Sequence, residues 1–328
     1  MRYIMRRVGF YLIALWAAVT INFIIPRLVP GDPVTSMLSK SSINATPAMR
    51  QSLENLLGVP HTSLWAQYVL YLQNLLHGDL GVSITHFPTP VTTLLAQEIP
   101  WTLGLVGLAS IISFFLGTLL GVIVSWKRDS WLDSLATPAL TFLSAIPYFW
   151  MALMLVLVLV VTYRLLPGTG GYDEFHVDIG LTPDFIGSVI QHGFLPALTI
   201  VISSMAGWLL TMRNSMVTTL SEDYVLMAQA KGLTEWRVMM AYAARNAILP
   251  NITGFALQLG FVVGGSLLTE LVFSYPGVGF QLYNAVTNLD YSLAQGIFLV
   301  IALAVLFSNF LADLVYVWLD PRIRQERR

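Results

Sequence analysis

Residues 221–250, SEDYVLMAQAKGLTEWRVMMAYAARNAILP, form a charged and small-residue stretch in a chain that is otherwise largely apolar. Ser221, followed by two acidic residues, is typical of a helix start, because a hydroxyl can cap free amides and acids complement the positive end of the helix dipole. Lys231 and Gly232 end this first helix, since glycine tolerates the left-handed conformation after a last turn. Thr234 can cap a second helix. The stretch is therefore predicted to hold two short helices joined by a glycine hinge.

The second predicted helix has an apolar stripe on one face and arginines on another. The stripe, at spacings of three and four, consists of Trp236, Met239, Met240, Ala243 and Ala247, with Arg237 and Arg245 on the other face. Small residues at 228, 230 and 232 let another backbone come close. The residues alone leave two interpretations open: an amphipathic helix resting on lipid, and a docking element for a cytosolic subunit.

The composition of the whole chain indicates a membrane protein. Of the 328 residues, 56% are apolar and 11% are charged, against about 25% charged residues in a typical soluble domain. The chain has no cysteine, which removes disulfides, thiolate metal sites and cysteine nucleophiles together. One sizeable membrane domain is therefore expected.

Six segments are long and apolar enough to cross a bilayer as helices. They lie near 8–28, 102–126, 136–163, 194–213, 250–273 and 293–318. If the N-terminus is inside, most Lys and Arg residues fall on the inner side, and Arg27, Lys40, Arg50 and Arg164 remain outside. Because cytoplasmic loops carry the excess of basic residues, we expect an all-α polytopic protein with six transmembrane helices and both termini in the cytoplasm. We divide it into residues 1–100, one helix plus an external segment, and a five-helix core, 101–328.

Two predicted external segments have different characters. The first, 30–100, should be folded or packed on the membrane domain, and its stretch LWAQYVLYLQNLLHGDLG predicts a helix ended by Gly78. This helix either lies along the outer membrane face or offers a docking surface to an external partner. The second, 165–193, is rich in glycine and acidic residues, which is typical of a solvated connection or a mobile recognition loop.

The sequence contains no recognisable catalytic motif. Neither G-x-x-x-x-G-K-[ST] nor H-E-x-x-H occurs, so we expect no nucleotide site, no catalytic residue, no metal site and no cofactor in this chain. All five histidines fall in predicted external segments, which argues against an intramembrane serine protease built on Ser266. That serine is better interpreted as a small residue that lets helices approach closely.

Two acidic residues lie near the membrane core, where ionisable groups are costly and usually mark a pathway or a partner. Glu270, near the outer end of the fifth span, either faces a substrate route or bonds to the following turn, FSYPGVG. Asp313, close to the arginines at the inner end of the last span, is expected to form a structural ion pair. Neither residue resembles the proton relay of a secondary transporter.

The 221–250 stretch also carries a family resemblance. A-x-A-K-G followed by RNAILP resembles the EAA loop of ATP-binding-cassette importer permeases, in the B-type subunit of the dipeptide, oligopeptide and nickel branch. Further matches in the expected order are LVPGDPV, HGDLGVS, LPALTI, TELVFSYPGVG and DLVYVWLDPRIR. Two departures are LMA at residues 226–228, where the family has E-A-A, and NLDYSL, where the branch often has an arginine before Asp-Tyr.

The resemblance implies the type I importer permease fold, in the inner membrane of a bacterium. It implies that a cleft on a cytosolic ATPase receives the loop's first helix. The residues assigned to this coupling are Glu222, Asp223, Tyr224, Ala228, Ala230, Lys231, Gly232, Leu233 and Arg245. Ser266 and Glu270 are assigned to the substrate pathway, and Asp313 to a structural polar contact.

The implied partners are a second homologous permease, two cytosolic ATPase subunits or domains that bind ATP and Mg²⁺, an extracytoplasmic solute-binding protein and the lipid bilayer. No nucleic acid is expected. Peptides are the implied solute, with nickel chelates, opines and oligosaccharides as alternatives. A secondary transporter and a membrane enzyme or structural protein are the competing classes.

Overall fold

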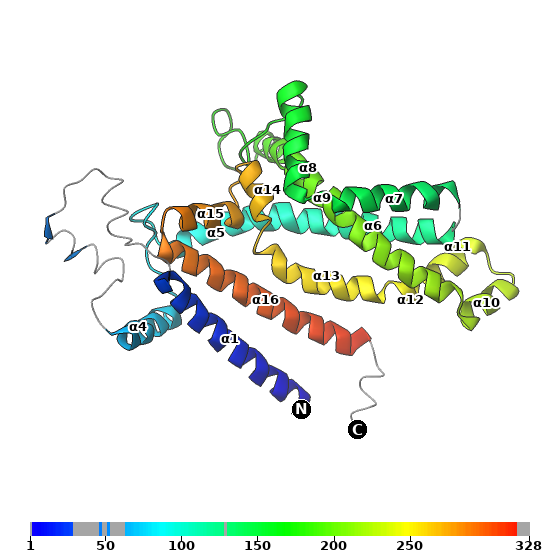
Figure 1. Ribbon diagram of the computed structural model, residues 1–328, viewed down its shortest axis with the longest axis horizontal. Coiled ribbons are helices and arrows are strands. Elements are labelled where there is room, and N and C mark those ends of the chain that lie inside the picture. Colours follow the sequence, from blue (N-terminus) through cyan, green and yellow to red (C-terminus); the bar gives the residue numbers. More distant parts are fainter. Residues whose placement is uncertain (1, 29–45, 48–50, 53–62, 128–129, 320–328) are drawn as a thin grey trace.

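The computed structural model describes residues 2–28, 46–47, 51–52, 63–127 and 130–319 (Figure 1). Most of the predicted external segment before residue 63 and the last part of DLVYVWLDPRIR lie outside these ranges. The helices in the described ranges are α1 (Arg2–Leu28), α4 (Leu64–Leu76), α5 (Val91–Thr102), η1 (Leu103–Gly107), α6 (Leu108–Trp126), α7 (Trp131–Ala145), α8 (Tyr148–Leu155), η2 (Val156–Thr162), α9 (Pro183–Leu220), α10 (Asp223–Ala230), α11 (Glu235–Arg237), η3 (Val238–Ala244), α12 (Arg245–Ala247), α13 (Leu249–Val262), α14 (Leu267–Val272), α15 (Val278–Thr287) and α16 (Tyr291–Leu319).

Four of the expected spans are long apolar helices. Gly9–Leu28, Val91–Trp126, Pro183–Leu220 and Tyr291–Asp313 have the length and composition to cross a membrane. Val91–Trp126 begins before the window 102–126, and Pro183–Leu220 extends past both ends of the window 194–213, because the helical pattern continues into less apolar sequence. An all-helical, multi-pass protein is thus confirmed among the described residues.

The other two expected spans are not straight single helices. The segment 136–163 divides into Asp133–Ala145 and Tyr148–Thr162, which meet at an angle of 95°. Ile146 there is extended, as expected for a residue before proline. The segment 250–273 is interrupted between α13 and α14, where Gly265 has a φ of +70°, a left-handed conformation that favours glycine. The prediction of continuous helices was wrong at these two places.

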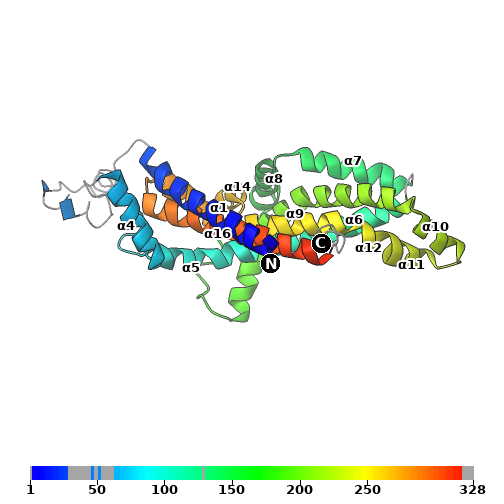
Figure 2. The ribbon, with the colours of Figure 1, turned by 90° about the horizontal axis from the view of Figure 1, so that it is seen from below.

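The long helices share an orientation that separates the molecule into two ends. Figure 1 shows α10 and α11 at one end of the long axis, and α4, α5, α14 and α15 toward the other. The start of α1 and the end of α16 point toward the α10 side. Figure 2 shows the same separation from below. The start of α1 and the end of α16 are therefore the ends of these two helices that are nearer to the segment 221–250.

Helices α6 and α9 pack closely along their length, and two glycines make this possible. A Cβ on Gly121 would lie 2.7 Å from the Met212 Cβ and 2.8 Å from the Leu209 carbonyl oxygen, and one on Gly117 would lie 2.7 Å from the Trp208 Cβ. Apolar burial alone gives little drive for association in lipid, so helices associate through close packing of this kind. The helices α6 and α9 thus form a closely packed pair.

Polar contacts tie two further helices to the bundle. Arg213 on α9 donates to both carboxylate oxygens of Asp133 on α7, at 2.9 and 3.0 Å. Asp313 on α16 lies against the Arg7 guanidinium and accepts a hydrogen bond of 2.6 Å from the Tyr11 hydroxyl, both on α1. Asp313 therefore joins the first and last helices and has the structural environment expected for it.

The described part of the segment that was predicted to be external packs on the long apolar helices. Helix α4 ends before Gly78, whose φ is +74°, so the predicted helix and its stop are confirmed. The Tyr68 hydroxyl lies 2.7 Å from the Thr20 hydroxyl on α1. Further along, buried Asp290 accepts hydrogen bonds from the Thr85 backbone and the Ser83 hydroxyl. Both ends of this segment are therefore fixed to the bundle.

A buried carboxylate holds the corner between α14 and α15. Glu270 is fully buried. One of its oxygens accepts from the backbone N–H groups of Gly279 and Phe280, at 2.7 and 3.1 Å, and the other from the Thr102 hydroxyl at 3.2 Å. The same hydroxyl accepts from the Val278 N–H at 2.8 Å. The first free N–H groups of α15 are thus all satisfied by side chains from other elements.

The space around this carboxylate requires residues without a side chain. A Cβ on Gly265 or Gly277 would lie 2.5 Å from a Glu270 oxygen, and one on Gly279 would lie 2.9 Å away. The glycines of the turn FSYPGVG therefore allow the acid to sit against the backbone. Of the two readings of Glu270, this geometry matches the bond to the following turn.

Gly121→Ala tests the α6–α9 contact. Because its Cβ has no room, we expect a loss of about 1–3 kcal/mol in the free energy of unfolding, measured by thermal unfolding in detergent. The matched control is Gly207→Ala on α9, where a Cβ meets nothing within 4 Å and a small stabilisation of about 0.5–1 kcal/mol is expected. Equal effects at the two positions would contradict the proposed close contact.

Glu270→Gln tests the corner between α14 and α15. The amide replaces one accepting oxygen by a donor, which leaves a buried donor without a partner at a cost of about 1–3 kcal/mol. A clear drop in the unfolding temperature is expected. Glu174→Gln, at an exposed carboxylate, is the control and should leave that temperature unchanged; a similar drop in both variants would exclude a special role for Glu270.

Candidate functional site

The first helix of the 221–250 segment is capped one residue later than predicted, because α9 continues up to Ser221. Ser221 closes α9, and its hydroxyl donates to the Thr218 carbonyl oxygen at 2.8 Å. Glu222 is the N-cap of α10, without a side-chain capping bond. The assignment of Ser221 as the cap was therefore wrong, because its hydroxyl is used by the preceding turn.

The hinge lies where the sequence places it. Lys231 is the C-cap of α10, and Gly232 has a φ of +75°. The Leu233 N–H closes the turn on the Ala228 carbonyl oxygen at 3.4 Å. Thr234 is the N-cap of α11, although its side chain makes no capping bond. From there α11, η3 and α12 follow one another directly, so the segment is a hairpin of two helical arms.

The two arms pack against each other and against the ends of α6 and α9. A buried cluster joins Val225 and Ala228 of α10 to Val238, Met239, Ala243, Ala244 and Ala247 of the second arm, and to Val122, Met212 and Met216 of the bundle. Trp236, expected in the apolar stripe, is instead 66% exposed, because it lies in the first turn, before the arm reaches the bundle. The hairpin is therefore a rigid extension of α6 and α9.

The residues assigned to coupling divide into exposed and buried groups. Ala228 is 3% exposed, so its small side chain serves the packing of the chain itself and does not receive another backbone, which corrects the expectation. Leu233 is half-buried. The exposed ones are Glu222, Asp223, Tyr224, Ala230, Lys231, Gly232 and Arg245.

Two apolar side chains belong to the same exposed surface and were not assigned to it. Leu226 and Met227 on α10 are 50% and 60% exposed. They lie in the LMA stretch, at the two positions that depart from the family motif, and were therefore not assigned to coupling. The sequence feature that points to them is that α10 is apolar almost all the way round, although only one face of a helix on the bundle can be buried. We call Tyr224, Leu226, Met227 and Ala230 the α10 outer face.

Two asparagines connect the hairpin to its surroundings, and sequence reasoning singled out neither. The Asn246 side chain donates to the Tyr224 hydroxyl at 2.9 Å, which joins the two arms. Asn251, fully buried at the start of α13, donates to the Thr118 hydroxyl at 2.9 Å and to the Trp208 carbonyl oxygen at 3.1 Å. The exit from the hairpin is thus fixed to both α6 and α9.

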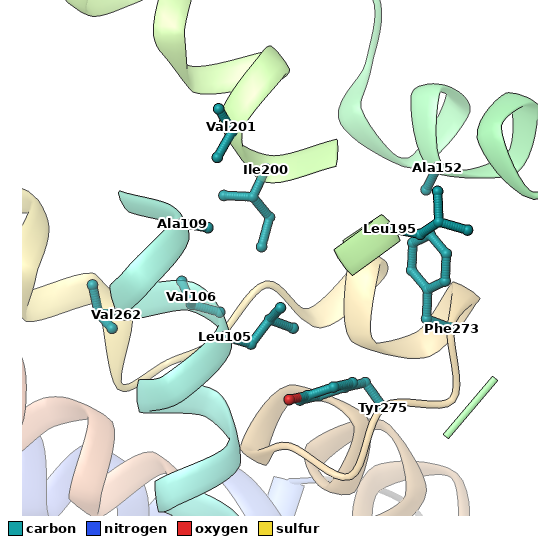
Figure 3. Packing of buried hydrophobic residues seen from close by; sticks show 10 residues of the cluster. All are labelled: Leu105, Val106, Ala109, Ala152, Leu195, Ile200, Val201, Val262, Phe273 and Tyr275. Carbon is teal, nitrogen blue, oxygen red and sulfur yellow. The ribbon is translucent and has the colours of Figure 1, made fainter. Parts of the chain in front are cut away.

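A cavity of about 430 Å³ opens between the middle of the long helices and the break after α13. Its polar lining includes Ser110, Ser203, Ser204, Gln258 and Ser266. The apolar lining includes Val106, Ile200 and Val262, part of the buried cluster that Figure 3 shows. Ser266 therefore lines the cavity.

Glu270 does not line this cavity. It lies directly behind Gly265, and its oxygens already accept hydrogen bonds. The two residues assigned to a substrate pathway are therefore close in space but differ in access to the cavity.

The acidic loop that was predicted to be external is shorter than expected and lines a second cavity. Helix α9 begins at Pro183, so the irregular part ends there and not at residue 193. A cavity of about 530 Å³ is lined by residues that include Asp173, Glu174 and His192. Beside it Phe175 is 94% exposed, and Leu181 in the same loop is 97% exposed. In the described part of the chain, no group of His, Asp and Glu residues could hold a metal ion.

The chain is similar to known proteins along its whole length. The family model described as "Binding-protein-dependent transport system inner membrane component" matches residues 117–325, which include the 221–250 hairpin. A dipeptide transport system permease protein of Escherichia coli K12 is 33% identical, with 100% of both chains covered. An oligopeptide transport system permease protein of Bacillus subtilis is 32% identical, with 98% of both covered.

A third relative, a putative peptide permease protein of Brucella suis, is 36% identical over 99% of both chains. The matched region contains the hairpin, the buried cluster that fixes it to the bundle, and the helices α9, α13 and α14 that surround the central cavity. The chain, a multi-pass membrane protein, belongs to the family of binding-protein-dependent transport system inner membrane components.

Proposed function

We propose that the chain is the permease subunit of an ATP-driven importer that moves short peptides into the cytoplasm. The full-length relatives named as dipeptide and oligopeptide permeases support the solute class. The chain itself carries no nucleotide-binding motif, so ATP and Mg²⁺ bind to partner subunits and hydrolysis takes place there. The protein is not an enzyme in its own right.

The observation that carries this proposal is the hairpin 221–250. Its inner side is packed on α6 and α9. The α10 outer face presents apolar side chains and the small residue Ala230, and the exposed acids Glu222 and Asp223 precede it. A partner that grips this face can move the ends of α6 and α9 directly, because the arms cannot bend independently of the bundle. A cytosolic ATPase with a matching groove would use the helix-in-groove mode of recognition.

The orientation follows from the hairpin and the basic residues. If 221–250 lies in the cytoplasm, the start of α1 and the end of α16, which point toward the α10 side (Figure 1), face the cytoplasm too. This orientation agrees with the distribution of Lys and Arg. The interrupted segment α13–α14 then counts as the fifth span, and α7–α8–η2 as the third. This gives six crossings in the inner membrane of a bacterium.

One chain of this size lines the central cavity from one side. We propose that a second homologous permease completes the pathway, with two ATPase subunits or domains below it and a solute-binding protein on the outer side. Closure of the two ATPases on ATP would draw two hairpins together and open the cavity outward. Ion-driven secondary transport is disfavoured, since no acidic residue lines the central cavity among the residues that the structure describes.

Ala230→Trp tests the docking of the ATPase. Ala230 is exposed, so the bulky side chain leaves the fold intact but obstructs a groove around α10. We expect about a tenfold or greater loss of ATPase subunits that co-purify with the permease, which equals about 1.4 kcal/mol of binding free energy. Hydrolysis stimulated by the loaded binding protein should fall in parallel.

The matched control for this variant is Ala96→Trp, at an exposed position on α5, far from the hairpin. It should retain the ATPase subunits and the stimulated hydrolysis. If both tryptophan variants, or neither, lose the ATPase, then the α10 outer face is not the docking site. Membrane insertion, measured by the yield of folded protein in detergent, should be normal in both.

The external loop 163–182 is the proposed contact of the solute-binding protein. Phe175 and Leu181 are almost fully exposed, so serine at both positions costs the permease little stability. The double variant Phe175→Ser, Leu181→Ser should raise the concentration of loaded binding protein needed for half-maximal ATPase stimulation by about tenfold. Leu76→Ser, at an 86% exposed residue of α4, is the control. An unchanged concentration dependence in the double variant would exclude the loop from docking.

A further inference from the structure

The central cavity has a mostly apolar lining with several neutral polar groups, and no charged residue is among its described lining residues. The described residues that line it include four serines, one glutamine and one tyrosine, and none of them is Asp, Glu, Lys, Arg or His. Its volume of about 430 Å³ falls in the range of about 300–1,000 Å³ that is typical of small-molecule sites. The cavity therefore has the size of a solute site and the chemistry of neutral hydrogen-bonding groups.

Two hydroxyls beside the cavity are buried and have no hydrogen-bond partner among the residues that the structure describes. Ser110 is 1% exposed, and neither its Oγ nor that of Ser203 makes a hydrogen bond there. A buried polar group without a partner is unfavourable. Both oxygens are enclosed, so they can pair with a molecule in the cavity only after their side chains rotate toward it. Ser204 and Gln258 add further donors and acceptors on the same wall.

The nearest carboxylate is kept away from the cavity. Glu270 stands behind the backbone of Gly265, and its oxygens accept from Gly279, Phe280 and Thr102. These donors offset its charge locally. On the other side, Val106 and Ile200 give an apolar wall (Figure 3). On this chain's side of the pathway, a solute in the cavity thus meets hydroxyls, an amide and hydrocarbon.

We infer that this cavity contacts the peptide backbone of the imported solute through neutral hydroxyl and amide groups, and that it does not select among solutes by side-chain charge. Each peptide unit offers one N–H and one C=O group, which serine and glutamine side chains can pair in any register. A fixed charge in the cavity would instead favour side chains of the opposite sign. This inference rests on the proposed importer function and specifies the solute chemistry of its pathway.

The absence of cysteine from the chain allows a charge to be added after folding. Ser204→Cys, at a half-buried lining residue, is modified in the assembled complex with a cationic or an anionic thiol reagent of similar size. Uptake of the dipeptides Ala-Ala, Ala-Lys and Ala-Glu is then measured in proteoliposomes at saturating loaded binding protein. The complex with the unsubstituted chain, treated in the same way, reports any effect of the reagents on partner subunits.

Without modification, we expect the three dipeptides to enter at rates within about threefold of one another. The anionic reagent should slow Ala-Glu about tenfold more than Ala-Lys, and the cationic reagent should reverse this order. Because the two reagents have similar size, such a reversal would show that the charge of the added group, and not its bulk, changes the uptake rates. Ser110→Ala and Ser203→Ala should slow all three dipeptides to the same extent. Ser63→Cys, exposed at the start of α4, is the control and should show no effect of either reagent.

Three outcomes would overturn the inference. The first is that the unmodified complex transports dipeptides of one charge class more than about tenfold more slowly than the others. The second is that both reagents slow all three dipeptides equally. The third is that neither reagent changes any uptake rate. Ser266→Cys, at a second lining position, replaces Ser204→Cys if the first variant does not assemble. Failure of the proposed function looks different, since the unmodified complex would then show neither dipeptide uptake nor ATP hydrolysis stimulated by the binding protein.

Discussion

The close contact of α6 with α9 is the constraint on which the other features depend. Gly117 and Gly121 let the two backbones approach closely, so the pair packs as one unit. At one end this unit carries the hairpin 221–250 through the cluster around Met212 and Met216. It also lines part of the central cavity through Ser110 and Ser203. Packed helices therefore connect the hairpin to the cavity, as the proposed coupling requires.

Hydrogen bonds of buried polar side chains fix the positions of α13, α14 and α15, the short helices around the break after Val262. Glu270 accepts hydrogen bonds from the first N–H groups of α15, and so fixes the corner after α14. Asn251 fixes the start of α13 to α6 and α9, at the point where the hairpin returns to the bundle. In an apolar environment such bonds have no competing water. These bonds thus fix both α13 and α14, and the break between the two helices lines the cavity.

Sequence patterns predicted most of the helices and the hinge, but misjudged how side chains divide between core and surface. The ends of α4 and α10 follow from Gly78 and Gly232, whose positive φ angles are local properties. Ala228 illustrates the limit, because a small residue can admit a partner or its own chain. Only the neighbouring arm, Val238 and Met239, decides for the latter. Leu226 was overlooked for the same reason, since an apolar helix does not show which face lacks a neighbour.

The sequence by itself determined the membrane class, the helical fold, the hairpin with its glycine and the family, because these depend on composition, periodicity and local backbone preference. Tertiary structure alone decided that Glu270 is enclosed while Ser266 lines a cavity, although they are only four positions apart. It also decided that the described residues lining this cavity are uncharged. The reason is that burial and pairing arise from residues distant in sequence, such as Thr102 with Val278, and no local pattern encodes which of them meet.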